Sequence, residues 1–390
     1  MKNDRLSSTD IIKHLASIPL ARFKRGFNLP IAPKVISYSV TWRCDAKCIM
    51  CDNKQKSNSS KNKSNELTAD NIYQIFSDKM LQSLDLIRFT GGEPMIKDDI
   101  VDIIKAIYDQ NNNDTIYYLT TNGSQTEKIV ELAESLISYG VKLHLQISLD
   151  APGDLHDKIR CYPGLYSKVI KTLEKLSQSK VKDKCVIGIS QTIIPENFNT
   201  IEKVKALANK LGFSYKHIIA FDLHENNDQV LDMENYKFNY RGNFTNDQLE
   251  MLYGLNQSKK TGDYKKSPKS AYLWNMTEKF LYEGGSNRVL RNISKPGFSC
   301  IALFSYFKLL PFGEIIPCTL KSNIIGNIKE KTFSEIWLGN SSQEMRHEVR
   351  KCKGCWVECD VVPSVFYSGD LPLWFFKKTM RNYSKNLFFI

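Results

Sequence analysis

The chain has 390 residues, a formal net charge of +12 at pH 7, and ordinary shares of hydrophobic (42%) and charged (25%) residues, which exclude bulk disorder and a mini-protein held by disulfides alone. No apolar run approaches the roughly 18 to 20 residues that cross a bilayer, and the polar first residues do not resemble a secretory signal, so we expect a cytoplasmic protein. Residues 1–33 hold six Lys or Arg against two Asp, and residues 361–390 hold four against one. This excess of basic residues at the two ends would keep the protein in solution, or would attract an anionic membrane surface, an acidic substrate or a nucleic acid.

Six strands alternate with helices over the first 222 residues. Strands are expected over 34–41, 84–90, 115–121, 141–150, 185–194 and 215–221, because these short apolar runs are rich in β-branched residues. Helical spacing of apolar residues predicts helices over 68–82, 100–108, 128–139, 166–177 and 201–211. This alternation predicts an α/β fold with a parallel sheet or barrel, in which functional groups collect just beyond the carboxyl ends of the strands.

The alternation stops after residue 222. Residues 223–296 are polar, aromatic and basic, and we interpret them as a bridging region over the barrel mouth. Short strands and cysteines follow, including a predicted hairpin over 304–318 that turns at Phe312 and Gly313, and a short helical stretch around Trp337. The predicted divisions are a basic N-terminal extension (1–33), a core (34–222), the bridging region (223–296), a small α+β cysteine domain (297–362) and an aromatic and basic tail (363–390).

Three cysteines follow the first predicted strand in the pattern CxxxCxxC. Disulfides are disfavoured in a chain without an export signal, so clustered cysteines are expected to bind metal or to serve redox chemistry. Cys44, Cys48 and Cys51 offer three thiolates to a [4Fe–4S] cluster, which leaves one iron open to a small molecule with an amine and a carboxylate. A zinc site or structural thiols are the alternatives.

Four short motifs follow the cysteine loop in order. They are GGEP at 91–94, TTNG at 120–123, SLDAP at 148–152 and HDKIR at 156–160. Together with the loop, which reads CDAKCIMC, they resemble the motifs of the radical S-adenosylmethionine (radical SAM) superfamily. Met50 stands where the family usually has an aromatic or bulky apolar residue. The resemblance covers about residues 34–222 and implies a partial, TIM-like (β/α)6 barrel with a cluster that cleaves SAM.

The resemblance also implies roles for single residues. The GGEP turn would hold the methionine part of SAM, its glycines letting the backbone approach the ligand and Glu93 accepting a hydrogen bond from the ammonium group. Ser148 and Asp150 would meet the ribose hydroxyls, with strand-end capping as the alternative. Arg160 would either clamp the SAM carboxylate or be a solvated charge. The implied SAM-binding set is Gly91, Gly92, Glu93, Pro94, Asn122, Ser148, Asp150 and Arg160.

Five cysteines follow the bridging region, at positions 300, 318, 352, 355 and 359. Their pattern resembles the SPASM extension of this superfamily, or its shortened relative called twitch. A full SPASM extension has more cysteines than these five and holds a second auxiliary cluster. The five cysteines therefore predict one auxiliary [4Fe–4S] cluster, and Cys352 and Cys359 compete for its fourth ligand position. A zinc ribbon is the alternative. The predicted ligands are Cys300, Cys318, Cys352, Cys355 and Cys359.

The implied reaction is reductive cleavage of SAM to methionine and a 5′-deoxyadenosyl radical, which abstracts a hydrogen atom from a substrate. A flavodoxin or ferredoxin would supply the electron, and the auxiliary cluster would assist oxidation or substrate binding. The reaction would be an oxidation, a cross-linking or an epimerisation. Cys161 is a candidate hydrogen donor, with a buried structural thiol as the alternative.

The substrate is predicted only by class, as a small molecule, a sugar or a lipid-linked metabolite. The 33-residue extension is too short for the recognition domain that peptide-modifying relatives often carry, so a peptide maturase is the alternative. A non-catalytic iron–sulfur or zinc-binding protein is the alternative of another class. Aromatic and basic residues over 371–390 predict peripheral contact with the inner membrane surface, or packing of the tail on the barrel. No RNA-binding module is identified, so nucleic acid is not an expected partner.

Overall fold

The computed structural model describes residues 19–20, 22–51, 63–111, 114–220, 244–248, 250–252, 280–281, 284, 297–352, 354–355 and 357–371, with the backbone alone at 358 and 359. The predicted bridging region and the tail beyond residue 371 therefore lie almost wholly outside the described residues. Within the part that is described, no helix has the length and apolar character needed to cross a membrane.

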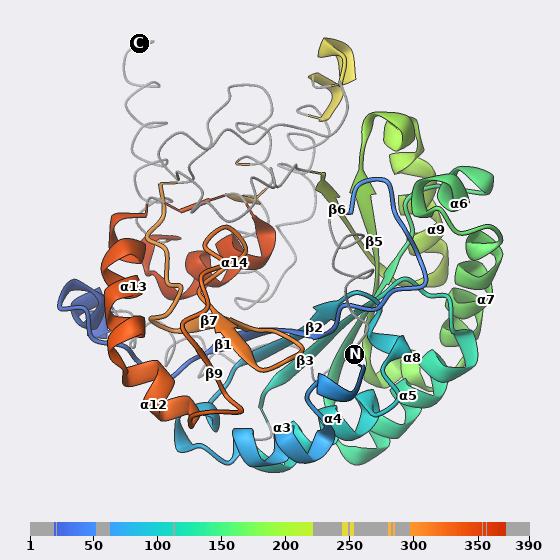
Figure 1. Ribbon diagram of the computed structural model, residues 1–390. Helices are drawn as coiled ribbons and strands as arrows, with labels where there is room; N and C mark the ends of the chain where they lie inside the picture. Colours follow the sequence, from blue (N-terminus) through green and yellow to red (C-terminus); the bar gives the residue numbers. More distant parts are fainter. Residues whose placement is uncertain are drawn as a thin grey trace, which may run out of the picture.

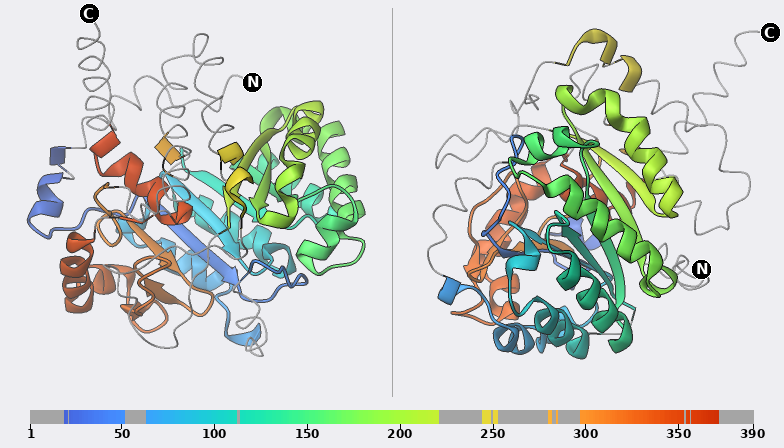
Figure 2. Two further views of the ribbon diagram at one scale, coloured as in Figure 1. Left: turned by 90° about the horizontal axis from the view of Figure 1, so that it is seen from above. Right: turned by 90° about the vertical axis from the view of Figure 1, so that its right-hand side faces the viewer.

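Six parallel strands form the core of the sheet, in the order β6-β5-β4-β3-β2-β1. They confirm the six predicted strands: β1 (Val35–Thr41), β2 (Leu86–Gly91), β3 (Ile116–Thr121), β4 (Lys142–Ser148), β5 (Val186–Ile193) and β6 (Ser214–Ile219). The sheet curves, and the helices between the strands lie on its outer side (Figures 1 and 2). This is the predicted partial (β/α)6 barrel.

The helices cover the outer face because alternate strand residues are apolar. Phe89 of β2, Tyr117 and Leu119 of β3 and Leu145 of β4 are buried against them in one continuous core. The intervening residues face the inside of the barrel, and those of β3 are all partly exposed. The helices are α3 (Ala69–Phe76), α4 (Ile100–Gln110), α5 (Thr126–Tyr139), α6 (Asp154–Arg160), α7 (Leu165–Gln178), α8 (Val181–Lys184) and α9 (Ile201–Leu211), with 3-10 turns η1 (Lys63–Asn65), η2 (Lys79–Leu81), η3 (Pro94–Ile96) and η4 (Pro195–Thr200).

The C-terminal part continues the same sheet. β7 (Tyr306–Leu309) pairs parallel with β1, and β8 (Glu314–Ile316) and β9 (Gly326–Asn327) follow as antiparallel strands. The predicted hairpin turning at Phe312 and Gly313 is confirmed, and so is the helical stretch around Trp337, which is α12 (Phe333–Leu338). The small domain is completed by α13 (Asn340–Lys351) and α14 (Glu358–Tyr367).

One predicted division of the chain lies inside a helix of the structure. The division at 362/363 falls inside α14, which continues through Pro363 because Val361 and Val365 are both buried in the C-terminal core. The described part of the N-terminal extension contacts the C-terminal domain, since Trp337 donates its indole N–H to the carbonyl of Ile31 (3.0 Å). Residues 22–33, here called the N-terminal segment, lie beside α13 (Figure 1), and the Asn28 side chain donates to the carbonyl of Gln343 (3.2 Å).

Candidate active site

The first cysteine loop follows β1 and is joined to the end of β2 by backbone hydrogen bonds. The N–H of Gly92 donates to the carbonyl of Thr41 (2.7 Å), and the N–H of Glu93 donates to that of Arg43 (2.8 Å). A Cβ added at Gly91 would lie 2.2 Å from the Thr41 oxygen, and one at Gly92 would lie 2.0 Å from the Arg43 oxygen. We expected these glycines to make room for a ligand. The space beside them holds the backbone that leads into the loop.

Polar groups on two further elements fix the cysteine loop. Asp45, inside the loop, accepts hydrogen bonds from the Asn122 side chain (2.6 Å) and the Ser124 hydroxyl (2.7 Å), both just beyond β3. On the other side, the N–H groups of Lys47 and Ile49 donate to carbonyls at the end of α6 (3.1 and 2.9 Å). Asn122, implied as a SAM contact, thus positions the loop. The sequence reasoning missed Asp45, although it stands between the first two cysteines of the motif.

Glu93 lies at the centre of this arrangement and is 2% exposed. Its carboxylate accepts hydrogen bonds from the N–H of Asn122 (2.6 Å), the hydroxyl of Thr121 (2.7 Å) and the N–H of Met95 (3.0 Å). Burial raises the pKa of Glu93 to about 7, and these three hydrogen bonds oppose the rise. A carboxylate has about four acceptor positions, so one remains for a further donor such as an ammonium group. Pro94, the last residue of the motif, is buried at the start of η3.

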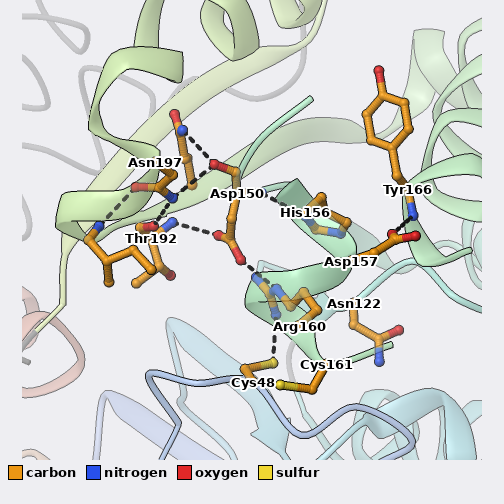
Figure 3. Close-up of polar contacts among 12 residues, drawn as sticks. Cys48, Asn122, Asp150, His156, Asp157, Arg160, Cys161, Tyr166, Thr192 and Asn197 are labelled. Atoms are coloured by element: carbon orange, nitrogen blue, oxygen red, sulfur yellow. Dashed lines mark hydrogen bonds and ion pairs between the residues drawn. The ribbon is translucent and has the colours of Figure 1, made fainter. Parts of the chain in front are cut away.

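Asp150 and Arg160 form a buried ion pair that reaches the cysteine loop (Figure 3). One Asp150 carboxylate oxygen accepts from the Arg160 Nε–H (2.5 Å), and the other accepts from the N–H of Thr192 (2.9 Å). The Arg160 Nη1 lies 3.7 Å from the Cys48 Sγ, within hydrogen-bond reach of sulfur. Arg160 therefore joins the strand-end carboxylate to a thiol of the loop.

This arrangement changes two sequence expectations. Asp150 is 0% exposed and both of its carboxylate oxygens accept protein donors, which favours the capping alternative over a contact with ribose hydroxyls. Asp150 accepts N–H groups of Arg160 and Thr192 just beyond the end of β4, as the alternative of strand-end capping predicts. Arg160 is not a solvated charge, because its side chain is 11% exposed. Burial alone would lower the pKa of Arg160, but the charge of Asp150 raises it above the ordinary value, so the guanidinium stays protonated. Ser148 ends β4 and is 8% exposed, beside Ser190 of β5.

The three thiols of the loop suit an iron–sulfur cluster. Burial raises the pKa of Cys44 to about 12 and also raises that of Cys48, where Arg160 acts in the opposite direction. Metal binding releases such protons, and thiolates are the usual ligands of [4Fe–4S] clusters. Among the described residues, no three His, Cys, Asp or Glu side chains converge on a single-ion site. A cubane takes one thiolate at each iron, so its ligands do not have to converge on one point.

A second set of thiols gathers in the C-terminal domain. The side chains of Cys300 and Cys352 are in hydrogen-bond contact, which raises the pKa of Cys300 further than its burial does. Cys318 and Cys355 are buried near them, and burial raises the pKa of both, to about 12 for Cys318. The side chain of Cys359 lies outside the described residues.

The two remaining thiols differ in their surroundings. Cys185 is buried and its thiol donates to the carbonyl of Leu143 (3.2 Å), as expected for a structural cysteine. Cys161 is exposed and ends α6 in the left-handed conformation, at a φ of 48°. The alternative that Cys161 is a buried structural thiol is therefore wrong.

The curated relatives of the chain include a heme synthase and a cyclase. The chain is 23% identical over 315 residues to the AdoMet-dependent heme synthase of Methanosarcina barkeri, covering 78% of this chain and 82% of the relative. It is 31% identical over 182 residues to the GTP 3',8-cyclase of Clostridium perfringens, covering 46% of this chain and 51% of the relative. The chain thus spans about half the length of that cyclase.

Two solved structures share the fold. Streptococcus suis SuiB has a TM-score of 0.55 at 14% identity, covering 87% of this chain and 72% of that one. anSMEcpe with bound AdoMet has a TM-score of 0.56 at 19% identity, covering 82% and 83%. Residues 38–208 match the family model of the radical SAM superfamily, and residues 300–356 match SPASM, an iron–sulfur cluster-binding domain. The first family implies SAM and a [4Fe–4S] cluster, and the second implies additional iron–sulfur clusters. Residues 38–208 therefore belong to the radical SAM superfamily, and residues 300–356 form a SPASM domain.

Proposed function

We propose that this protein is a radical SAM enzyme acting on a small molecule, a sugar or a lipid-linked metabolite. When bound, the first cluster and SAM supply a 5′-deoxyadenosyl radical that removes a hydrogen atom from the substrate. The observation that carries the proposal is the three-thiol loop, held rigidly by β2, β3 and α6 at the carboxyl ends of the strands. Catalytic groups of barrel enzymes gather at this end.

The chain's own residues have distinct tasks in this proposal. Cys44, Cys48 and Cys51 would hold the first [4Fe–4S] cluster, and three thiolates for four irons would leave one iron for SAM. Glu93 accepts the ammonium group of SAM at its remaining acceptor position. Arg160 keeps a positive charge next to the Cys48 sulfur. A flavodoxin or ferredoxin supplies the electron.

We further propose that Cys300, Cys318, Cys352 and Cys355 hold one auxiliary [4Fe–4S] cluster. The contact between Cys300 and Cys352 favours Cys352 as the fourth ligand over Cys359. We expect Cys352→Ala to lower the iron content of the anaerobically purified protein by one cluster, while Cys359→Ala keeps the wild-type content. The reverse outcome would assign the fourth position to Cys359.

The function is tested by anaerobic reconstitution with iron and sulfide, followed by SAM and dithionite. We expect 5′-deoxyadenosine from the wild type, none from Cys48→Ala, and wild-type amounts from the control Cys185→Ala, whose thiol is structural. A protein that binds iron but releases no 5′-deoxyadenosine would be a non-catalytic iron–sulfur protein, and one that holds zinc in place of iron would be a zinc protein. Either result would overturn the proposal. A peptide substrate is the alternative within the superfamily.

A further inference from the structure

A helix near the N-terminus is joined to the rest of the protein through its polar side. Residues 19–20 and 22–26 are helical and are here called the N-terminal helix. Arg22 forms an ion pair with Asp370 (2.6 Å), and the Arg25 Nε–H donates to the carbonyl of Cys300 (3.0 Å). These two arginines therefore attach the helix to the C-terminal domain, beside α13 (Figure 1).

The opposite side of the N-terminal helix is apolar and exposed. Leu20, Phe23 and Phe27 are 55%, 59% and 66% exposed. Residues three and seven positions after Leu20 lie on the same side of a helix as Leu20, whereas positions 22 and 25 lie on the other side. A surface helix ordinarily buries its apolar side and exposes its polar side. The N-terminal helix has the reverse orientation.

The exposed apolar side chains form a group. The ring centres of Phe23 and Phe27 are 4.6 Å apart, and Leu29, which follows them, is 50% exposed. Single exposed apolar residues are ordinary on a protein surface, but apolar residues gathered in one patch mark a contact with another protein or with a membrane. Leu20, Phe23, Phe27 and Leu29 are here called the exposed apolar face.

The charge around this face favours an anionic surface. Residues 1–33 hold six Lys or Arg against two Asp, and residues 372–390 hold four Lys or Arg and no Asp or Glu. The pairing of Asp370 with Arg22 places the start of the second stretch beside the N-terminal helix. Lys24, four residues after Leu20, lies on the same side of the helix as the apolar residues. Each Lys or Arg close to an anionic bilayer contributes about 1 kcal/mol to binding.

We propose that the exposed apolar face docks on an anionic lipid bilayer, with Phe23 and Phe27 entering the interfacial region and the surrounding cations at the headgroups. Apolar and aromatic side chains combined with Lys and Arg are typical of helices that lie in the membrane interface. A second copy of the chain is a less suitable occupant, because two molecules with a net charge of +12 repel each other. The inference goes beyond the proposed function, since the face contains none of the residues that would hold the clusters or SAM.

The test is flotation of the reconstituted full-length protein with two kinds of vesicle, one of phosphatidylglycerol and phosphatidylcholine in equal parts and one of phosphatidylcholine alone. We expect the wild type to float with the anionic vesicles and not with the zwitterionic ones, and added salt to weaken the binding because it screens the charges. The double variant Phe23→Ser, Phe27→Ser should bind at least about tenfold more weakly, since two aromatic side chains no longer leave water. The double variant Phe23→Leu, Phe27→Leu should retain binding.

Tyr73→Ser is the matched control, because Tyr73 is an aromatic residue of α3 that is 44% exposed and does not belong to the face. Its binding should equal that of the wild type. A thermal melt checks that each variant is folded.

Four outcomes would overturn the inference. The wild type floats with neither vesicle, it floats equally with both, the folded serine double variant binds as tightly as the wild type, or the wild type is a dimer in gel filtration that the serine double variant converts to a monomer. The last result would make the face an interface between copies of the chain. Flotation is measured without SAM, so its failure would leave the proposed enzyme standing, and an absence of 5′-deoxyadenosine would leave the membrane contact standing.

Discussion

Arg160 links two groups that lie far apart in the sequence, and its charge acts directly on the first cysteine loop. Its guanidinium is held by Asp150 at 2.5 Å and lies 3.7 Å from the Cys48 sulfur. Hydrogen bonds to cluster sulfurs are among the factors that set reduction potentials. A positive charge favours the reduced, more negative cluster, so we expect Arg160→Gln to lower the potential of the N-terminal cluster. The measurement is an EPR-monitored redox titration.

The matched control for Arg160 is Lys158→Gln, which removes an exposed positive charge from the same helix. Its potential should equal that of the wild type. An unchanged potential in Arg160→Gln would mean that the contact with Cys48 has no electrostatic consequence.

We expect His156 to make the stability of the protein depend on pH between about 6.5 and about 4. It is 0% exposed and its Nδ1 accepts the N–H of Asp150 (3.1 Å). Burial, and then the nearby Arg160, lower the pKa of His156 to about 4. The unfolded chain has a histidine pKa near 6.5 and binds the proton first on acidification, so this contribution to stability is lost as pH falls from about 6.5 to about 4. Glu93, with its pKa raised to about 7, changes stability in the opposite direction over the same range.

The variant His156→Asn separates the titration of His156 from that of Glu93. Its asparagine keeps an acceptor for the Asp150 N–H but does not titrate. Between pH 6.5 and pH 5, the wild type should lose about 2 kcal/mol more unfolding free energy than His156→Asn. Urea unfolding at the two pH values measures the difference, and parallel pH profiles would contradict the assignment.

At the scale of elements, the junction between β1 and β2 depends on the absence of a side chain at Gly92. A Cβ there would lie 2.0 Å from the Arg43 carbonyl oxygen, so Gly92→Ala has to push the cysteine loop away from β2. We expect the variant to retain less iron after reconstitution and to lose several kcal/mol of stability, on the order of 3 kcal/mol or more. Gly26→Ala is the control, since nothing lies within 4 Å of its added Cβ. Wild-type iron content in Gly92→Ala would contradict this view.

The elements themselves were largely predictable, but their contacts were not. Each of the six strands begins and ends within about two residues of its sequence prediction, because short β-branched runs bounded by turn residues identify buried strands. The contact between Arg160 and Cys48 joins residues 112 positions apart, and no local pattern signals it. For the same reason, the sequence indicated Asp150 as a strand-end residue of the site without indicating that Arg160 and Thr192 would occupy its carboxylate.

At the scale of the whole molecule, Trp337 joins the N-terminal segment to the C-terminal domain. It is 0% exposed, packs on the rings of Phe307 and Phe333, and donates to the Ile31 carbonyl. Replacing it with alanine removes a large buried side chain, which typically costs 3–5 kcal/mol. We expect Trp337→Ala to lower the unfolding temperature in calorimetry, with Leu338→Ala, 51% exposed, as the neutral neighbour. Equal melting temperatures would contradict this role.

The pairing of β7 with β1 has a consequence for any attempt to divide the chain. β1 has β2 on one side and β7 on the other, so both rows of its backbone groups are bonded. A fragment truncated after residue 220 would leave one of those rows bare, and an unprotected strand edge readily pairs with another molecule. Such a fragment is expected to form oligomers or precipitate, as light scattering would show. We therefore expect the SPASM segment to protect this edge of the barrel independently of any iron it holds.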